Sequence, residues 1–385
     1  MNNRCKFVRN AISVAHSSRF LTVLALAFLL GPAAHAQSGG LRYHLTDLQS
    51  SSRSKVAPNL SVAYAINEAG QITGDLVYGN NQYCFIYTPG LWPGTTFTSA
   101  TASTLWCDAR AINSAGDVAG SIYVPNGIVN AFLRQSDGAL GVYPSIYGYN
   151  SLGWGIDDTR SVVGEMDPDF VYRTAYSWNS AGTPFDISAA YISSGYGYQA
   201  LATSASGSYI SVLDVNGGMT ILVPQGIYLL PLCGFVDGIA GSTAYAVNNK
   251  GHAVGQAWCE EANDPHAALW AQLPNDLEMA ATDLGPTSTA YAISSDDWVV
   301  GHSGAWSGGA GDAFLRVSDP HCPTMVNLNL LLDAASTGWK VVQAYGINTA
   351  HQIVGQATDS TGKLHAVLLA PDNNLPLCAK TKTKF

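Results

Sequence analysis

The stretch AYAINEAGQITGD, from Ala63 to Asp75, decides the fold because the chain repeats it. Further copies of the pattern A-x-A-[IV]-N-x-x-G-x-V-x-G begin at Ala109, Gly153, Ala244, Ala290 and Ala344. The interval 244 − 153 = 91 residues is about twice the spacing of the first three copies, which begin at 63, 109 and 153. A diverged copy is therefore expected in this interval. The segment ALATSASGSYIS, from Ala200 to Ser211, fits, although it lacks the Asn and the closing Gly.

Each copy has the pattern of a β-hairpin. Two short alternating runs flank N-x-x-G, in which Asn can hydrogen-bond to the turn backbone and Gly can adopt a positive φ. A third apolar run follows, as in His266 to Trp270, and a weaker fourth reads apolar-[DN]-apolar, as in Thr282-Asp283-Leu284. Seven units of about 46 residues without a convincing helix predict an all-β fold, a seven-bladed β-propeller of four-stranded antiparallel blades.

The opening segment Tyr43 to Leu48 is expected to close the ring. It has the fourth-strand pattern but no hairpin before it, whereas the seventh unit ends soon after its third strand. An N-terminal strand that completes the last blade leaves no exposed sheet edge. In the alternative, Asn374-Leu375 supplies the seventh unit's own fourth strand, and residues 41 to 48 form an extra edge.

The repeat resembles that of the HAF-repeat family of bacterial extracellular proteins, whose units look like A-x-A-I-N-x-x-G-x-V-V-G followed by H-A-F-L-W and D-L-G. Here His266 to Trp270 and His365 to Leu368 approach the second element, and Asp283-Leu284-Gly285 matches the third. The resemblance covers nearly all of the chain after the leader. It implies a secreted repeat protein with a propeller-like fold, and it implies no catalytic residue and no reaction.

Residues 1–36 are typical of a secretory signal. Basic residues precede the apolar run Leu21 to Leu30, and Ala34-His35-Ala36 is a small-x-small cleavage site. Ten apolar residues are too few for a bilayer span, which needs about 20. We therefore expect a secreted or periplasmic protein with no membrane span after cleavage near Ala36, a propeller domain over 37–375 and a tail over 376–385.

The charge of the exported chain disfavours phosphate-rich partners. The leader carries four of the 18 Lys+Arg and none of the 27 Asp+Glu, which leaves 14 − 27 = −13. Nucleic acid and anionic lipid both bind clustered Lys and Arg. The expected partner is an unknown protein or polysaccharide, and the protein is expected to be a monomer.

Six cysteines follow the leader: Cys84, Cys107, Cys233, Cys259, Cys322 and Cys378. An even number in an oxidising compartment favours disulfides, with 15 possible pairings. We favour neighbour pairing (Cys84 with Cys107, Cys233 with Cys259, Cys322 with Cys378) because it also ties down the tail. The absence of C-x-x-C spacing disfavours structural zinc and redox chemistry.

The residues that recur with the repeat have structural explanations. Asn is a favoured opener of a tight turn, and four turns begin with Asn67, Asn113, Asn248 and Asn348. The third strand begins with His266 and His365 in two units but with Asp312 or Asn130 in others. A metal ring would need the same ligand several times, so hydrogen bonding is favoured over metal binding.

The sequence predicts no catalytic residue, metal or cofactor. Gly301-His302-Ser303-Gly304-Ala305 approaches the G-x-S-x-G nucleophile elbow. It lacks the final Gly and follows a strand of a β repeat, so it fails the strand-to-helix context that the elbow requires.

Candidate binding residues lie in the segments that vary between units. If strands run outward from the channel, loops between strands two and three share one face with the inter-blade segments. The inter-blade segments contribute Tyr147, Tyr149, Tyr196, Tyr198 and Trp339, and the loops contribute Asp167, Asp169, Glu260, Glu261 and Asp264. Aromatics among Ser and Gly suit recognition, although the tyrosines could equally pack between blades. The acidic loops could chelate Ca²⁺, but a solvated surface is favoured.

Two functions follow. The first is an exported non-enzymatic scaffold that binds a protein or an envelope polysaccharide through this loop face. The alternative is a propeller hydrolase or lyase acting on a glycan, with loop carboxylates at the channel mouth. The alternative requires two of the five loop carboxylates to lie about 5 to 10 Å apart in a pocket.

Overall fold

The hairpins of the repeat form the inner halves of four-stranded antiparallel sheets. The computed structural model describes residues 40–49, 58–98, 105–125, 127–146, 148–167, 173–191, 199–213, 219–223, 226–229, 242–258, 265–272, 279–304, 311–319 and 325–372. Within these residues there are seven such sheets. We number them 1 to 7 in the chain order of their hairpins.

Sheet 1 contains β2 (Leu60–Ile66), β3 (Ile72–Tyr78), β4 (Asn81–Thr88) and β5 (Leu91–Phe97). Sheet 2 contains β6 (Cys107–Ile112), β7 (Val118–Tyr123), β8 (Val129–Arg134) and β9 (Leu140–Tyr143). Sheet 3 contains β10 (Asn150–Ile156), β11 (Val162–Asp167), β12 (Thr174–Trp178) and β13 (Pro184–Asp186), and α1 (Ile187–Tyr191) follows it. Sheet 4 contains β14 (Gln199–Thr203), β15 (Ile210–Leu213), β16 (Met219–Val223) and β17 (Gly226–Leu229).

Sheet 5 contains β18 (Ser242–Val247), β19 (Ala253–Trp258), β20 (Pro265–Gln272) and β21 (Met279–Gly285). Sheet 6 contains β22 (Ser288–Ile293), β23 (Val299–Ser303), β24 (Asp312–Arg316) and β25 (Val326–Asn327), and two short 3₁₀ helices follow it, η2 (Leu328–Leu331) and η3 (Ala334–Ser336). Sheet 7 combines β26 (Lys340–Ile347), β27 (Ile353–Thr358) and β28 (Leu364–Pro371) with β1 (Tyr43–Asp47).

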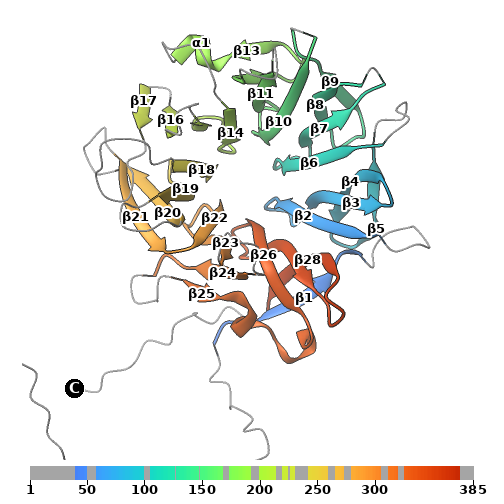
Figure 1. The fold of residues 1–385 in the computed structure, drawn as a ribbon, viewed down its shortest axis with the longest axis vertical. Coiled ribbons are helices and arrows are strands. Elements are labelled where there is room, and N and C mark those ends of the chain that lie inside the picture. Colours follow the sequence, from blue (N-terminus) through green and yellow to red (C-terminus); the bar gives the residue numbers. More distant parts are fainter. Residues whose placement is uncertain are drawn as a thin grey trace, which may run out of the picture. The chain divides into compact units, whose positions relative to one another are not determined.

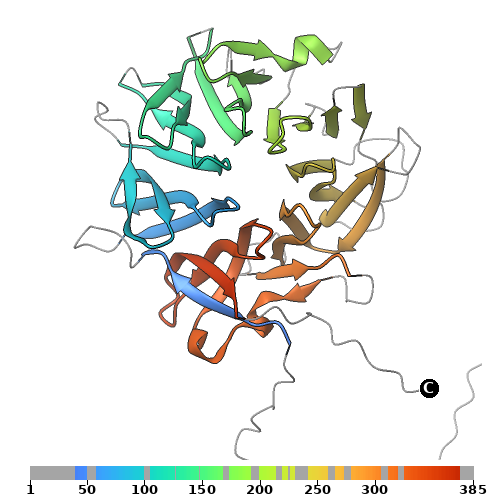
Figure 2. The same cartoon turned by 180° about the vertical axis from the view of Figure 1, so that it is seen from behind.

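The first strands of the sheets form a closed cycle. β2 contacts β6, and the contacts continue through β10, β14, β18, β22 and β26 back to β2. Figures 1 and 2 show the sheets arranged in a ring with these strands innermost. Apolar side chains fill the space between neighbouring sheets, as in the cluster that joins Leu76 and Phe85 of sheet 1 to Val354 of sheet 7. The all-β propeller with four-stranded antiparallel blades is confirmed.

β1 occupies the place of a fourth strand in sheet 7. It pairs antiparallel with β28, with Tyr43 opposite Pro371 and Asp47 opposite Val367. Asp47 Oδ1 lies 3.2 Å from His365 Nδ1, just as Asp283 Oδ2 of β21 lies 2.9 Å from His266 Nδ1. The His of the third strand and the Asp of the fourth are thus hydrogen-bond partners, as the favoured structural role of these histidines requires. The alternative strand at Asn374-Leu375 lies outside the described residues.

A β-bulge in the first strand explains the closing glycine of the repeat. In all seven sheets the register of the first two strands shifts at the second position of A-x-A, as between Ala63 and Ala65. The bulge brings a carbonyl oxygen of the first strand toward the closing glycine. A Cβ on Gly120 would lie 1.9 Å from the Asp108 oxygen, and one on Gly301 would lie 2.0 Å from the Thr289 oxygen. A side chain therefore cannot be added without moving backbone.

The turn asparagines connect each hairpin to the next. Asn67 Oδ1 accepts the backbone N–H groups of Ala69 and Gln71, and its Nδ2 donates to the Asn113 carbonyl of sheet 2 at 2.9 Å. The same inter-sheet bond is made by Asn113, Asn248 and Asn348. Sheets 3, 4 and 6 lack this Asn, and other bonds replace it: Asp158 N to Ala205 O, Ser206 N to Asn249 Oδ1, and His351 Nε2 to Asp296 Oδ2. The structural role expected of the asparagines is confirmed.

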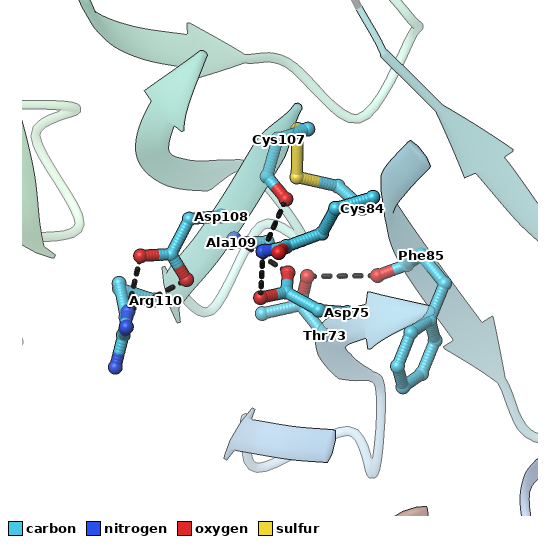
Figure 3. The surroundings of a disulfide bond; sticks show 9 residues. Thr73, Asp75, Cys84, Phe85, Cys107, Asp108, Ala109 and Arg110 are labelled. Atoms are coloured by element: carbon cyan, nitrogen blue, oxygen red, sulfur yellow. Dashed lines mark hydrogen bonds and ion pairs between the residues drawn. A yellow bond between two sulfur atoms is a disulfide. The ribbon is translucent and has the colours of Figure 1, made fainter. Parts of the chain in front are cut away.

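A disulfide joins Cys84 on β4 of sheet 1 to Cys107 on β6 of sheet 2 (Figure 3). This is one of the three expected pairs. The remaining cysteines, Cys233, Cys259, Cys322 and Cys378, lie outside the described residues. In the described ranges no helix is both long and apolar enough to cross a bilayer.

Candidate functional site

Three of the ten predicted binding residues belong to the described part of the chain. Tyr149 is exposed (42%) in the loop after β9, and Asp167 ends β11 opposite Asn150. Trp339 packs edge-on against His365, with ring centroids 5.1 Å apart, and against the core between sheets 6 and 7. Trp339 thus fits the packing alternative. The other seven predicted residues lie outside the described residues: Tyr147, Tyr196, Tyr198, Asp169, Glu260, Glu261 and Asp264. The expected pairing of loop carboxylates therefore cannot be measured on the described chain.

The bulges bring together a set of residues that the sequence analysis did not select. The extra residue of each bulge lines a central cavity of about 290 Å³. We call this set the channel ring; its members are Tyr64, Arg110, Trp154, Leu201, Tyr245, Tyr291 and Tyr345. Its signal in the sequence is the second position of A-x-A, which varies between units while both neighbours stay small.

Six members of the ring form an unbroken series of aromatic and cation–π contacts. The ring centroids of Tyr245 and Tyr291 are 5.7 Å apart, those of Tyr291 and Tyr345 5.0 Å, and those of Tyr345 and Tyr64 5.3 Å. The Arg110 guanidinium carbon lies 4.2 Å from the Tyr64 centroid and 5.4 Å from that of Trp154. Such contacts hold aromatic and guanidinium groups in fixed orientations.

On one side of the ring each tyrosine has a polar side chain of its own strand near its hydroxyl. Tyr345 donates to Gln343 Oε1, and Thr243 and Thr289 lower the pKa of Tyr245 and Tyr291 against the effect of burial. Each of these polar residues precedes its tyrosine by two positions. Burial raises the pKa of Tyr291 to about 12 and also raises the pKa of Tyr245. We call these three tyrosines the closed side because each hydroxyl has a polar side chain of its own strand beside it.

On the other side only Arg110 has a hydrogen-bond partner of this kind within its own strand. The residues two positions earlier are Val62, Asp108 and Leu152. Trp154 Nε1–H is buried and makes no hydrogen bond with the described residues, and the Tyr64 hydroxyl makes none either. Arg110 donates Nε to Asp108 at 2.8 Å, but Nη1 and Nη2 form no hydrogen bond within the described chain. Tyr64, Arg110 and Trp154 are the open side.

Two buried carboxyl groups lie behind Arg110. Figure 3 shows Asp108 against the guanidinium, and Asp75 beside Ala109. Asp75 accepts the Ala109 N–H at 3.0 Å and Gln82 Nε2 at 2.8 Å. Burial, and then the neighbouring Asp108, raises the pKa of Asp75 well above its ordinary value. Burial disfavours the charge of Arg110, but Asp108, Tyr64 and Asp75 together outweigh it and the pKa of Arg110 is raised. Asp108 is therefore the ion-pair partner of Arg110 by geometry, and the raised pKa of Asp75 favours its protonated form.

The hairpin turns form the mouth of the cavity. A neighbouring cavity of about 430 Å³ is lined by turn residues, among them Glu68, Asp158, Asn249 and Thr349. Glu68 accepts the N–H and hydroxyl of Thr349, and Asp158 accepts the N–H and hydroxyl of Ser114 at 2.9 and 2.8 Å. The mouth thus presents hydroxyl, amide and carboxylate groups above an aromatic floor.

No family model matches the chain, and no curated protein sequence matches it. An oligogalacturonate lyase in complex with manganese has a similar structure, with a TM-score of 0.51, 11% identity, and coverage of 88% of this chain and 97% of that chain. TolB from Acinetobacter baumannii aligns with a TM-score of 0.42 and 12% identity over 82% of this chain, which spans 64% of the TolB chain. A putative TolB from Agrobacterium tumefaciens aligns with a TM-score of 0.39 and 14% identity, covering 64% of this chain and 90% of that one. At these identities the likeness to the lyase shows a β-propeller fold and nothing about activity.

Asp75 and Asp108 are not among the residues that line the two cavities, and Asp108 is held against Arg110. In the described ranges no group of three or more His, Cys, Asp or Glu is arranged to hold a metal ion. The groups that do face the cavity are aromatic rings, hydrogen-bond donors and a polar mouth, which is the composition of a small-ligand pocket.

Proposed function

We propose that the protein is an exported, non-enzymatic scaffold that binds one unit of an envelope polysaccharide in its central cavity. The channel ring carries this proposal, because it places aromatic faces and unpaired donors at the floor of a cavity with a polar mouth. Polar groups with aromatic surface suit a ligand that has both hydroxyl groups and apolar C–H faces. The predicted leader and the Cys84–Cys107 disulfide support a secreted or periplasmic location.

The proposal moves the expected site from the loop face to the hairpin-turn mouth. The cavity lining runs from the channel ring to the turns that contain Glu68, Ser114 and Asp158. The loop face remains a second prediction, since most of its candidate residues lie outside the described chain. Membership of the HAF-repeat family is likewise proposed on the repeat motifs alone.

The experiment compares the two faces. The exported chain is screened against immobilised polysaccharides, and the hits are measured with Leu201→Trp, which fills the cavity, and with Tyr149→Ala, which alters the loop segment. We expect Leu201→Trp to weaken binding at least about tenfold, the effect of losing about 1.4 kcal/mol, and Tyr149→Ala to leave it unchanged. The reverse result would place binding on the loop face, and release of sugar products from the polysaccharide would favour the enzymatic alternative.

A further inference from the structure

We propose that the open side of the channel ring is a subsite for a carboxylate, which in the ligand belongs to a sugar acid. This inference rests on the proposed polysaccharide binding and names the chemical class of the unit that enters the cavity. Its three residues are Tyr64, Arg110 and Trp154. The Tyr64 hydroxyl, the two Arg110 Nη groups and Trp154 Nε1–H form no hydrogen bond within the described chain.

The open side offers mainly donors. The Arg110 Nη groups and Trp154 Nε1–H can only donate, and the Tyr64 hydroxyl can donate or accept. A carboxylate only accepts, so it satisfies this set without introducing a donor of its own, whereas a sugar hydroxyl adds a proton that must find an acceptor. Because Trp154 Nε1–H is buried, a bound acceptor also removes the cost of leaving it unpaired.

The guanidinium is already fixed for this contact. Tyr64 and Trp154 flank Arg110, with their centroids 4.2 and 5.4 Å from the guanidinium carbon, and Asp108 holds Nε. The Nη groups are the remaining donors, and two parallel N–H bonds are the geometry with which Arg binds carboxylates. A preorganised side chain loses little conformational entropy when the ligand binds.

The charges around the subsite are compatible with an anion. Asp108 is the carboxylate in direct contact with Arg110, and Asp75 behind it favours its protonated form because burial and Asp108 raise its pKa. The acids at the mouth, Glu68 and Asp158, each accept hydrogen bonds from a neighbouring turn. They lie four residues further along their strands than the ring positions, near solvent, where salt screens their repulsion.

Trp178 provides a matched comparison for Trp154. It lies on β12 of the same sheet, its Nε1–H also has no hydrogen-bond partner among the described residues, and it is buried in the core against Tyr143 and Tyr176. An unpaired indole N–H is therefore not itself a ligand site. Trp154 differs because it lines the cavity beside Arg110.

The test is calorimetric titration of the exported chain with glucuronate and with glucose, which differ only at C6. We expect glucuronate to bind at least about tenfold more tightly, since a hydrogen bond to a charged group contributes about 1.5 kcal/mol or more. Trp154→Phe and Arg110→Lys should each reduce this preference about tenfold or more, and Trp178→Phe should keep it. Near-ultraviolet circular dichroism confirms that each variant is folded.

Four outcomes would overturn the inference. Equal binding of glucose and glucuronate would contradict the carboxylate subsite without contradicting the proposed polysaccharide binding. A preference that survives both Trp154→Phe and Arg110→Lys would place the carboxylate elsewhere. Acetate that binds as tightly as glucuronate would indicate a free small acid, and a peptide C-terminus that binds in place of glucuronate would indicate a protein partner. Loss of all polysaccharide binding, in contrast, contradicts the proposed function itself.

Discussion

The two sides of the channel ring share one backbone and differ in what their polar groups do. Tyr245, Tyr291 and Tyr345 have Thr or Gln two residues earlier, and these polar side chains lie near the tyrosine hydroxyls. Tyr64 and Trp154 have Val and Leu at that place, and their polar groups are left for the cavity. The repeat therefore determines the common backbone of the bulged hairpins, which we call the frame. Two variable positions in each first strand, the bulge residue and the residue two positions before it, determine the chemistry of the channel.

The largest expected effect tests whether the frame is common to both sides. We expect Gly120→Ala in sheet 2 and Gly301→Ala in sheet 6 each to lower the free energy of unfolding by about 3 kcal/mol or more, because the new Cβ meets a backbone carbonyl. Urea denaturation followed by circular dichroism measures both.

Sheet 4 supplies the control for these variants. It keeps the bulge, but Val212 lies opposite Ala200, where the other sheets have the closing glycine. Because a side chain is already accommodated there, Val212→Ala should lower the stability only by the loss of two buried methyl groups, about 1.6 kcal/mol. If either glycine variant is as stable as the parent, that sheet accommodates a Cβ as sheet 4 does, and the close carbonyl does not require glycine there.

The next largest effect is the loss of stability when the disulfide next to the open side is removed. The Cys84–Cys107 disulfide closes a loop with a sequence separation of 23 residues, between sheets 1 and 2. Its removal by Cys84→Ala with Cys107→Ala should lower the stability by about 3 kcal/mol, mainly because the unfolded chain gains conformational freedom.

The same double substitution sharpens the comparison of the two sides. The disulfide joins the strands next to Asp75 and Asp108, so hydrogen exchange should accelerate first in β4 and β6 and remain slow in β22 and β26. Uniform acceleration in all four strands would mean that the two sides unfold as one unit.

The smallest effect is an opposite pH dependence on the two sides. In sheet 6, burial alone would raise the pKa of Asp297, but hydrogen bonds from Lys250, His252 and Asn248 outweigh it and lower the pKa. Asp297 thus contributes stability above the unfolded aspartate pKa of about 3.9, and the contribution is lost as the pH falls through its folded pKa. The pKa of Asp75 is raised by burial and Asp108, so its contribution is complete below about pH 3.9 and is lost as the pH rises through its folded pKa.

The measurement is the unfolding free energy of Asp297→Asn and Asp75→Asn between about pH 3 and 7. The loss caused by Asp297→Asn should grow by about 1 kcal/mol as the pH rises toward 5. The stability of Asp75→Asn relative to the parent should improve over the upper part of the range. Curves that run parallel to the parent for both variants would contradict the assigned pKa directions.

The sequence predicted most of the frame because the frame is built from repeated local signals. N-x-x-G places the hairpins, the third and fourth runs place the outer strands, and the fourth-strand pattern of Tyr43 to Leu48 predicts the strand that pairs with β28. The Cys84–Cys107 pair followed from proximity in sequence. These features depend on residues within one unit or on its nearest neighbours.

The sequence analysis did not predict the candidate site because the site is formed by the position of A-x-A whose residue changes from unit to unit. A bulge has no simple sequence pattern, so nothing marked the second position of A-x-A as the residue that faces the channel. Aromatic residues were sought in long variable segments instead, where Tyr149 and Trp339 lie. Asp75 and Asp108 are 33 residues apart (108 − 75), and their contact exists only because sheets 1 and 2 are neighbours.

The pairing of β1 with β28 has a consequence for how the chain reaches its folded state. Tyr43 and Pro371 are register partners although 371 − 43 = 328 residues separate them. During synthesis from the N-terminus β1 is made long before β28, so sheet 7 can be completed only after β28 has been made. Distant partners of this kind slow folding and prolong the exposure of unpaired strand edges. Loss of β28 would accordingly leave β1 without its antiparallel partner, with only its contacts to the segment around Leu332 and Ser336 remaining.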